Sequence, residues 1–274
     1  MQSVYGNRPV SRGYPDLEKL GVEYYAVAQD PHSRVQETLQ CLETLIDVSE
    51  GPRTVAIVGC GPKPSTLKVL LDRGFDAVGI EPLVGSVEAA AHFIGDGARV
   101  LRGSAECVPL DDGSQRIVLM ENVLEHVDSP GLALKEAYRL LVGGGVLFVY
   151  TTNRLKCSLT GKNAEFRKRF YNWFPDIVKE SYIYKHLHYD PRLANYAPRP
   201  AVHWFTFADL CRLGRQVGFA QFYSLLDLVD LGAASVSGHV LRRMLLNRVR
   251  YNPWLRAVAL TQYGNSIFMF KREE

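Results

Sequence analysis

The sequence predicts an α/β fold, a mostly parallel sheet with helices on both faces, on the basis of three observations. Short apolar, β-branched segments alternate with helical segments between residues 54 and 151. A glycine turn, Gly59-Cys60-Gly61, directly follows the first of these strands. Glu81 ends the next strand, about twenty residues further on. A strand, a glycine turn and a helix, followed by a carboxylate placed to accept two ribose hydroxyls, indicate a nucleotide-type ligand.

The elements follow from hydrophobic periodicity and from turn residues. Strands are expected at residues 54–58, 76–80, 99–101, 116–120, 146–151, 219–225 and 266–270. Helices are expected at residues 32–48, 65–73, 86–94, 130–141, 207–217 and 240–250. Ser65 is expected to cap its helix, and the glycines at 143–145 are expected to form a helix C-cap and turn.

The chain is expected to form four parts. Residues 1–50 are interpreted as an N-terminal lid and helix, and residues 51–152 as the ligand-binding core. Residues 153–202 break the alternation and are rich in aromatic side chains, which indicates a cap insertion. The pattern resumes in residues 203–274, which complete the sheet.

Composition narrows the class of protein. The chain has 274 residues, of which 47% are hydrophobic, so it can bury a substantial core. Its formal net charge of +3 is too small to predict a nucleic-acid or membrane partner by itself. The five cysteines are widely spaced and form no Cys-x-x-Cys pair, which argues against a zinc site or a disulfide framework and favours a reducing cytoplasm. No signal peptide and no membrane span are expected.

Five segments, in order, resemble the motifs of one enzyme family. They are Gly59-Cys60-Gly61-Pro62, Glu81-Pro82, Ser104-Ala105-Glu106, the segment 121–127 (ENVLEHV) and the segment 139–145 (RLLVGGG). The chain thereby resembles class I S-adenosylmethionine-dependent methyltransferases. The segment 203–206 (HWFT), with Gly218-Phe219, resembles the small-molecule branch that includes ubiquinone-biosynthesis methyltransferases.

This resemblance implies a Rossmann-like seven-stranded methyltransferase sheet, with helices on both faces, an antiparallel last strand and a helical or loop cap insertion. It implies S-adenosyl-L-methionine as the cofactor. The residues it assigns to the cofactor are Gly59, Cys60, Gly61, Pro62, Glu81, Pro82, Ala105, Glu106, Glu121 and Asn122. In this assignment Glu81 accepts the ribose hydroxyls and Glu106 the adenine amino group, if its carboxylate turns inward. The family usually has an acid just before the first glycine, where this chain has Val58.

Some of these residues could have a purely structural role instead of binding a ligand. Gly59 and Gly61 could form a turn that binds nothing, and Glu106 could be a solvated loop carboxylate. A nicotinamide-dependent dehydrogenase would share the glycines and the acid, but Pro62 and Pro64 stand where it needs a third glycine.

His126 and His203 are the candidate catalytic residues. An unperturbed imidazole, with a pKa of about 6.5, suits removal of a proton at neutral pH. Either histidine could instead be held by hydrogen bonds near the start of a helix. Some related methyltransferases hold a divalent ion with a Glu-x-x-Glu-His motif, but the first position here is Asn122, and we expect no metal site.

The sequence therefore predicts methyl transfer to a small-molecule or glycan acceptor, onto an oxygen atom. The alternatives are an RNA methyltransferase and a non-catalytic partner subunit that retains the fold. Aromatic and basic residues alternate at 166–171, but the run is short and nucleic acid is not the expected partner. The amphipathic segment 240–250 could pack on the domain, form a homodimer or contact a membrane surface.

Overall fold

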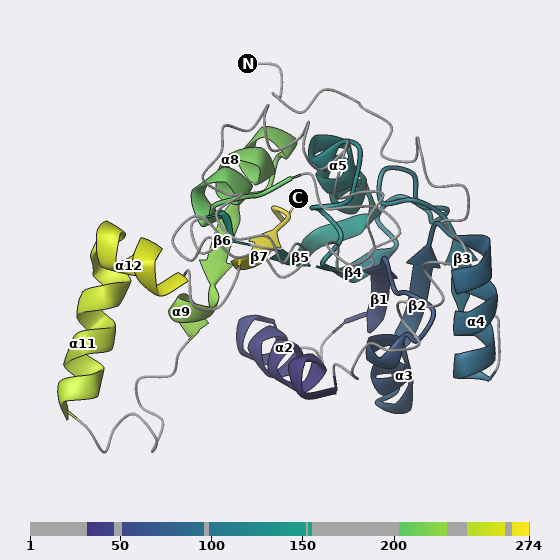
Figure 1. The fold of residues 1–274 in the computed structure, drawn as a ribbon, viewed down its shortest axis with the longest axis horizontal. Helices are drawn as coiled ribbons and strands as arrows, with labels where there is room; N and C mark the ends of the chain where they lie inside the picture. The colour runs from purple at the N-terminus through teal and green to yellow at the C-terminus, as the bar shows by residue number, and fades with distance from the viewer. Residues whose placement is uncertain are drawn as a thin grey trace, which may run out of the picture.

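A computed structural model describes residues 32–46, 51–95, 99–151, 153–154, 203–228, 240–260 and 265–273. Its centre is a seven-stranded sheet with the strand order β3-β2-β1-β4-β5-β7-β6 (Figure 1). The strands are β1 (Thr54–Val58), β2 (Asp76–Glu81), β3 (Val100–Arg102), β4 (Gln115–Glu121), β5 (Leu141–Thr151), β6 (Gln221–Ser224) and β7 (Asn265–Phe270). The first five pair in parallel, and β7 runs antiparallel to both β5 and β6. The predicted seven-stranded sheet with an antiparallel last strand is confirmed.

Helices cover both faces of the sheet. One face packs against α2 (His32–Leu45), α3 (Ser65–Asp72) and α4 (Val84–Ile94). The other face packs against α5 (Pro130–Leu140) and α8 (Phe207–Val217). Because each face has its own hydrophobic cluster, strand β1 buries both sides. Ala56 and Val58 belong to the cluster with α5 and α8, while Val55 and Ile57 belong to the cluster with α2 and α3. This double burial explains the uninterrupted apolar run of β1.

Two predicted helix caps are wrong. Ser65 is the first residue of α3, and Pro64 occupies the N-cap position without a side-chain hydrogen bond. The glycines at 143–145 do not cap α5, because the helix ends at Leu140 and the next residue, Leu141, is already in extended backbone and begins β5. Gly144, with φ +72°, lies instead in a stretch of β5 where the pairing with β4 shifts register. A left-handed glycine thus serves a strand irregularity here.

The C-terminal third contains helices that the sequence analysis missed. α9 (Leu225–Leu228) follows β6, and α12 (Pro253–Leu260) follows the predicted helix α11 (Val240–Tyr251). Within the described ranges, no helix is long and apolar enough to cross a membrane. Most of the predicted lid (1–31) and of the predicted cap insertion (155–202) lies outside the described residues.

Candidate functional site

The site lies where strands β1, β2 and β4 end. β1 pairs in parallel with β2 on one side and with β4 on the other, so their carboxyl ends share one edge of the sheet. The chain leaves β1 toward β2 and β3, and later returns to the other side with β4 and β5. The gap between β1 and β4 is therefore the topological switch point, where ligands of open α/β sheets bind.

The glycine turn closes over the end of β2. The backbone N–H groups of Gly59 and Cys60 both donate to the carbonyl oxygen of Ile80, at 2.8 and 3.1 Å. Gly59 and Gly61 have φ values of +71° and +70°, which disfavour any residue with a Cβ. A Cβ on Gly59 would also lie 2.5 Å from the Val123 side chain in the loop after β4. Backbone conformation therefore favours glycine at both positions, and packing against Val123 adds to this at Gly59.

Glu81 joins the end of β2 to this turn. The residue is only 7% exposed, and its Oε2 accepts a hydrogen bond from the Gly61 N–H at 3.1 Å. Its Oε1 accepts from the Leu83 N–H at 3.4 Å. The structure thus brings together two residues that the sequence analysis assigned to one ligand. A buried carboxylate beside bare backbone is suited to accept hydrogen bonds from hydroxyl groups.

Cys60 packs beneath the turn. A Cβ on Gly79 of β2 would lie 2.7 Å from the Cys60 Sγ, so the thiol fills the space that this glycine leaves. Burial, together with the nearby charge of Glu81, raises the pKa of the Cys60 thiol far above its usual range. The protonated thiol is a weak nucleophile, and the contacts are those of a packing residue.

The loop after β3 contains the predicted adenine-reading residues. Ala105 is 7% exposed and belongs to the hydrophobic cluster beneath α5. The Oε1 of Glu106 accepts from the backbone N–H groups of Asp128 and Ser129, at 2.9 and 3.3 Å. In this arrangement Glu106 holds the loop that leads into α5. Its contact with adenine stays a prediction, and Oε1 is already engaged by these two bonds.

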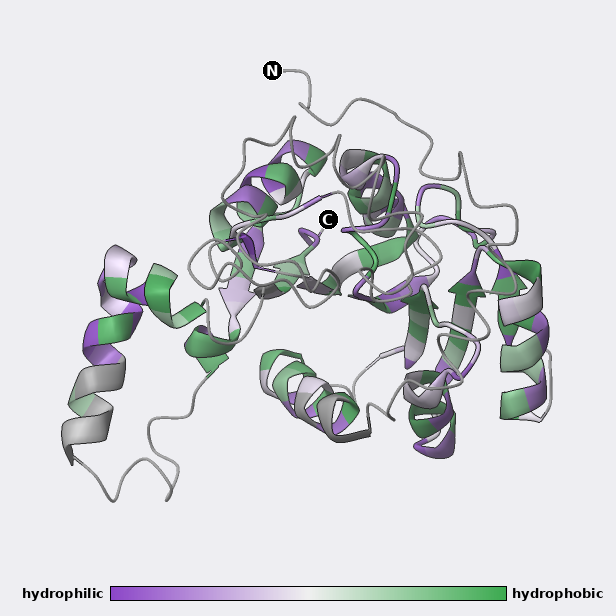
Figure 2. Ribbon diagram, in the orientation of Figure 1, coloured by the Kyte–Doolittle hydropathy of each residue, from purple (hydrophilic) through white to green (hydrophobic). Residues whose placement is uncertain are grey.

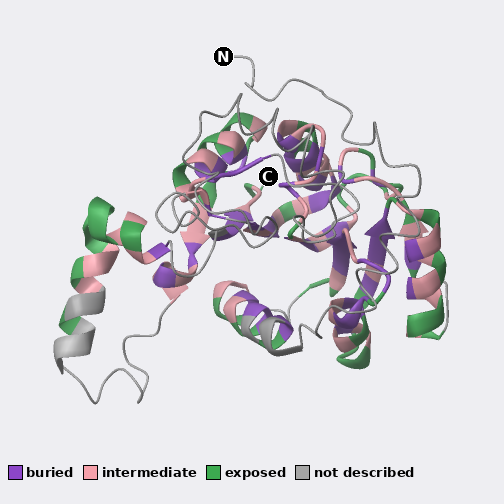
Figure 3. Cartoon of the chain, in the orientation of Figure 1, coloured by how far each residue is buried: buried purple, intermediate pink, exposed green. Residues whose placement is uncertain are grey.

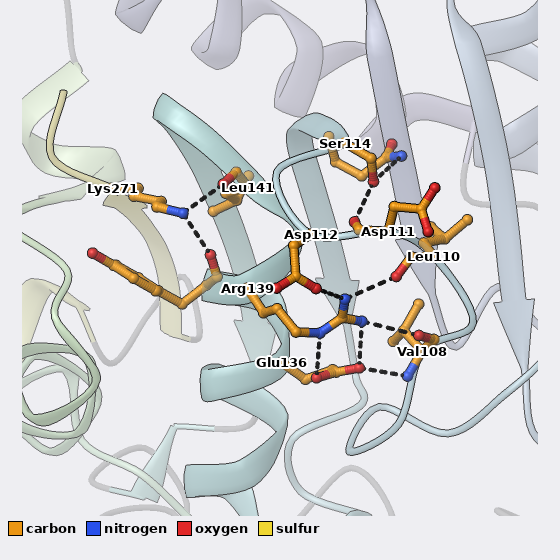
Figure 4. A network of polar contacts seen from close by, with 11 residues as sticks. Val108, Leu110, Asp111, Asp112, Ser114, Glu136, Arg139, Leu141 and Lys271 are labelled. Atoms are coloured by element: carbon orange, nitrogen blue, oxygen red, sulfur yellow. Dashed lines mark hydrogen bonds and ion pairs between the residues drawn. The ribbon is translucent and has the colours of Figure 1, made fainter. Parts of the chain in front are cut away.

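Arg139 on α5 clamps the continuation of this loop (Figure 4). Its guanidinium donates to the carbonyl oxygens of Val108 and Leu110, at 3.0 and 2.9 Å. It also donates to both oxygens of Glu136, at 3.0 and 2.8 Å, and to Asp112. Glu136 in turn accepts from the Val108 N–H at 2.8 Å. Hydrogen bonds from Arg139 lower the pKa of the Glu136 carboxyl, so the pair stays ionised while it fixes the loop.

The end of β4 has an unusual backbone. Asn122 has φ +54° and is the one described non-glycine residue with a positive φ. Its N–H donates to the Tyr150 carbonyl of β5 at 2.8 Å, and its side chain is exposed. Glu121, directly before it, pairs with Tyr150 in the sheet register. Such backbone outliers concentrate at functional sites, and asparagine tolerates them better than most residues.

A buried polar cluster, which the sequence analysis missed, connects β4 and β5 to residue 203. Glu125 is 1% exposed, and its Oε2 accepts from the Thr151 hydroxyl at 2.7 Å. The backbone N–H of His203 donates to the Glu125 carbonyl at 3.2 Å, and its Nε2 lies 2.9 Å from the Val127 carbonyl oxygen. A carbonyl can only accept, so Nε2 is protonated in this contact. In the sequence, Glu125 within the 121–127 motif was the residue that could have indicated this cluster.

The two candidate bases differ in environment. His203 is 2% exposed, and burial lowers its pKa to about 4, against the opposing effect of its bond to Val127. It is therefore neutral at physiological pH. His126 is only partly buried and lies in the turn after β4, where its N–H donates to the Val123 carbonyl at 2.9 Å. Within the described ranges, no group of three acidic, histidine or cysteine side chains could hold a metal ion.

The part of the chain that forms this site resembles a known protein family. Residues 57–149 match a family described as a methyltransferase domain, and they run from within β1 nearly to the end of β5. Residues 57–149 therefore match a methyltransferase domain, and the seven-stranded sheet has the fold of class I methyltransferases. The matched residues include the glycine turn, Glu81 and the loop that Arg139 clamps.

Relatives match over less than half of the chain. An uncharacterized methyltransferase of Mycobacterium sp. (strain KMS) is 34% identical over 125 residues, which cover 45% of this chain and 47% of that protein. One from Mycolicibacterium gilvum (strain PYR-GCK) is 37% identical over 94 residues, covering 34% of this chain and 36% of that protein. The matches thus span about half or less of the curated relatives.

Two solved structures share the methyltransferase fold. The plantazolicin methyltransferase BamL, solved with a triazolic desmethylPZN analog and SAH, has a TM-score of 0.56 at 13% identity. This match covers 96% of the chain and 94% of BamL. A protein of Galdieria sulphuraria, provisionally assigned as a sarcosine dimethylglycine methyltransferase, has a TM-score of 0.53 at 10% identity, with 93% and 97% covered. At these identities the likeness concerns the fold.

Proposed function

We propose that the chain binds S-adenosylmethionine at the shared edge of β1, β2 and β4, and transfers its methyl group to an oxygen atom of a small-molecule or glycan acceptor. The observation that supports this best is the contact between the buried Glu81 carboxylate and the Gly61 N–H at the switch point of the sheet. The methyltransferase domain over residues 57–149 supports the same cofactor.

The residues present fit such a cofactor. Its ribose offers two hydroxyl donors, and Glu81 offers two carboxylate oxygens at the end of β2. The glycines at 59 and 61 keep side chains out of the turn that would meet the methionine portion. Val58 is 2% exposed and packs in the core, so the acid that the family usually has there is replaced by an apolar contact. The cofactor itself supplies a methyl group already activated on a sulfonium, and no covalent enzyme intermediate is required.

The chain then has to orient the acceptor and receive a proton, because O-methylation of a hydroxyl releases one. We assign the proton to His126. His203 is buried and already donates through Nε2, and its pKa of about 4 makes it a weak base. His203 is proposed as a positioning residue, since its bonds to the Glu125 and Val127 carbonyls hold the turn that contains His126. The acceptor class comes from the sequence resemblance and from the aromatic residues of segment 153–202.

Calorimetric titration with S-adenosylmethionine and S-adenosylhomocysteine tests the cofactor site. Glu81→Ala removes both carboxylate oxygens, and Glu88→Ala, an exposed glutamate on α4, is the matched control. Loss of two charge-assisted hydrogen bonds, roughly 3 kcal/mol in total, should weaken binding by about 100-fold. The Glu88→Ala chain should bind like the wild type.

Because Glu81 also bonds to the turn, Glu81→Gln and a thermal melt accompany the test. An Ala variant that melts like the wild type but binds equally well would refute the role of Glu81. No binding by the wild-type chain would refute the cofactor and favour a non-catalytic partner subunit. Steeply salt-dependent RNA binding would favour the RNA methyltransferase alternative.

A further inference from the structure

Helices α11 and α12 carry an unusual share of exposed apolar surface. The described residues include eight large hydrophobic side chains that are exposed. Five of these eight belong to the two helices: Met244, Tyr251, Trp254, Leu255 and Val258. Trp254 is 82% exposed and Tyr251 is 80% exposed, far more than a packed aromatic. The two helices lie at the edge of the molecule beyond β6, and their exposed positions are green in Figure 3.

These side chains are arranged in stripes. On α11, Met244, Arg248 and Tyr251 are exposed at positions i, i+4 and i+7, which share one side of a helix. On α12, Trp254 and Val258 are exposed at i and i+4. Figure 2 shows hydrophobic residues along most of α12. We refer to the exposed residues Met244, Arg248, Tyr251, Trp254 and Val258 of the two adjoining helices together as the α11–α12 face.

The corner between the two helices is rigidly built. Asn252 caps α12, because its Oδ1 accepts from the backbone N–H groups of Trp254 and Leu255, at 3.0 and 3.1 Å. Pro253 is the first residue of α12, where its fixed φ suits a helix start. The two most exposed aromatic side chains, Tyr251 and Trp254, flank this corner, so they are presented without a large loss of backbone freedom on binding.

Two arginines tie the helices to the rest of the domain. Arg256 of α12 donates to both carboxylate oxygens of Asp227 in α9, at 2.7 and 2.6 Å. Arg250 of α11 donates to the Leu226 carbonyl at 3.0 and 2.8 Å, and to the Asp227 carbonyl at 2.9 Å. Arg250 and Arg256 thus form the anchor to α9, whereas Arg248 is exposed on the α11–α12 face.

The charge of the segment is one-sided. Residues 240–260 contain no aspartate or glutamate, and Arg248 adds a cation to the α11–α12 face, whereas Arg250 and Arg256 bond to α9. Cations mixed with tryptophan, tyrosine and aliphatic residues are the composition of helices that lie in the headgroup region of an anionic bilayer. A second copy of the chain fits less well, since a two-fold interface places the same patch, with the same Arg248 cation, against itself.

We propose that the α11–α12 face docks onto the surface of membranes that contain anionic phospholipids. Trp254 and Tyr251 enter the headgroup layer, where amphipathic rings are favoured, and Arg248 contacts lipid phosphates. The proposal is independent of the cofactor and of the methyl acceptor.

Vesicle co-sedimentation of the full chain tests the proposal, with phosphatidylcholine vesicles, with or without phosphatidylglycerol. We expect binding to the mixed vesicles only, and weaker binding as salt is raised. Trp254→Ala with Val258→Ser should weaken binding at least about tenfold, because it removes apolar area that enters the bilayer. Phe93→Ala with Leu132→Ser is the matched control, since both side chains are exposed but lie on α4 and α5.

A second pair of variants tests the contribution of the Arg248 cation. Arg248→Gln should weaken binding to mixed vesicles about fivefold, which corresponds to about 1 kcal/mol per arginine near the surface. Arg212→Gln, on α8 and 66% exposed, should leave binding unchanged.

Fluorescence with brominated lipids identifies which tryptophan enters the bilayer. The fluorescence of Trp254 should be quenched when the chain binds these vesicles, and Trp254→Phe should remove this quenching. Trp204 is only 4% exposed and should not be quenched.

Several results would overturn the proposal. These are the absence of binding to mixed vesicles, equal binding to pure phosphatidylcholine, or binding that survives the Trp254 and Val258 substitutions. A dimer in light scattering that these substitutions dissociate would make the face a contact between two copies instead.

Discussion

The substitution Arg139→Met should destabilise the domain strongly, because one guanidinium organises a whole loop. Arg139 makes five hydrogen bonds, to the carbonyls of Val108 and Leu110, to both oxygens of Glu136, and to Asp112. Methionine keeps most of the side-chain volume but none of the donors. The carbonyls at 108 and 110 and the Glu136 carboxylate then lose their cationic partner in a partly buried setting.

The magnitude follows from the exposure of each partner. The Asp112 side chain is 81% exposed, so its ion pair contributes little. The remaining four bonds are charge-assisted and worth roughly 1.5–3 kcal/mol each when well shielded. The Arg139 side chain is 29% exposed and the bonds share one group, so we discount their sum to about 3 kcal/mol. At roughly 2–4 °C per kcal/mol, the melting temperature should fall by about 6–12 °C.

Thermal and urea unfolding measure this loss, and Arg212→Met is the matched control. Arg212 also pairs with an acid three residues earlier on its helix, Asp209, but its side chain is 66% exposed. We expect that control to change the free energy of unfolding by at most about 0.5 kcal/mol. Equal effects of the two substitutions would show that the loop does not depend on the clamp and would refute the reasoning.

Two further predictions concern the turn and the buried histidine. Gly59→Ala should cost about 1–3 kcal/mol more than Gly74→Ala in urea unfolding, because both have positive φ but only the first Cβ meets another side chain, Val123 at 2.5 Å; equal costs would show that the clash is relieved. The pKa of His203 is lowered from 6.5 to about 4, so between these pH values the unfolded chain binds a proton at this histidine and the folded chain does not. Stability is then full above pH 6.5 and falls by up to about 3 kcal/mol toward pH 4. His203→Gln should flatten this part of the profile, and an unchanged slope would contradict the assignment.

The strands and most helices could be predicted from the sequence because burial on two faces imposes a strong local pattern. The ends of helices were harder to predict from the sequence. The end of α5 is held by Lys271, whose ammonium donates to the Tyr138 and Leu141 carbonyls, at 3.3 and 2.8 Å. This cap comes from the far end of the chain, so no local signal at 141–145 could reveal it. The glycines next to it then served a strand irregularity instead of a cap.

The proximity of Gly61 and Glu81 could be foreseen, because neighbouring parallel strands end at one edge of the sheet. The contacts of Glu106 could not, since its partners Asp128 and Ser129 lie on a loop whose path depends on tertiary packing. The same holds for Glu125, which meets the Thr151 hydroxyl across two strand ends.

The position of the buried ionisable groups gives an independent argument for the site. Glu81, Glu125 and His203 are the acidic or histidine side chains classed as buried in the described part of the chain. Burying such groups is costly unless they are hydrogen-bonded, and a fold gains little stability from them. All three nevertheless lie at the carboxyl edge of the sheet or bond to the loop after β4. The hydrophobic clusters on both faces of the sheet need no such groups to be stable. Their concentration at one edge is therefore best explained by the demands of a ligand and its chemistry.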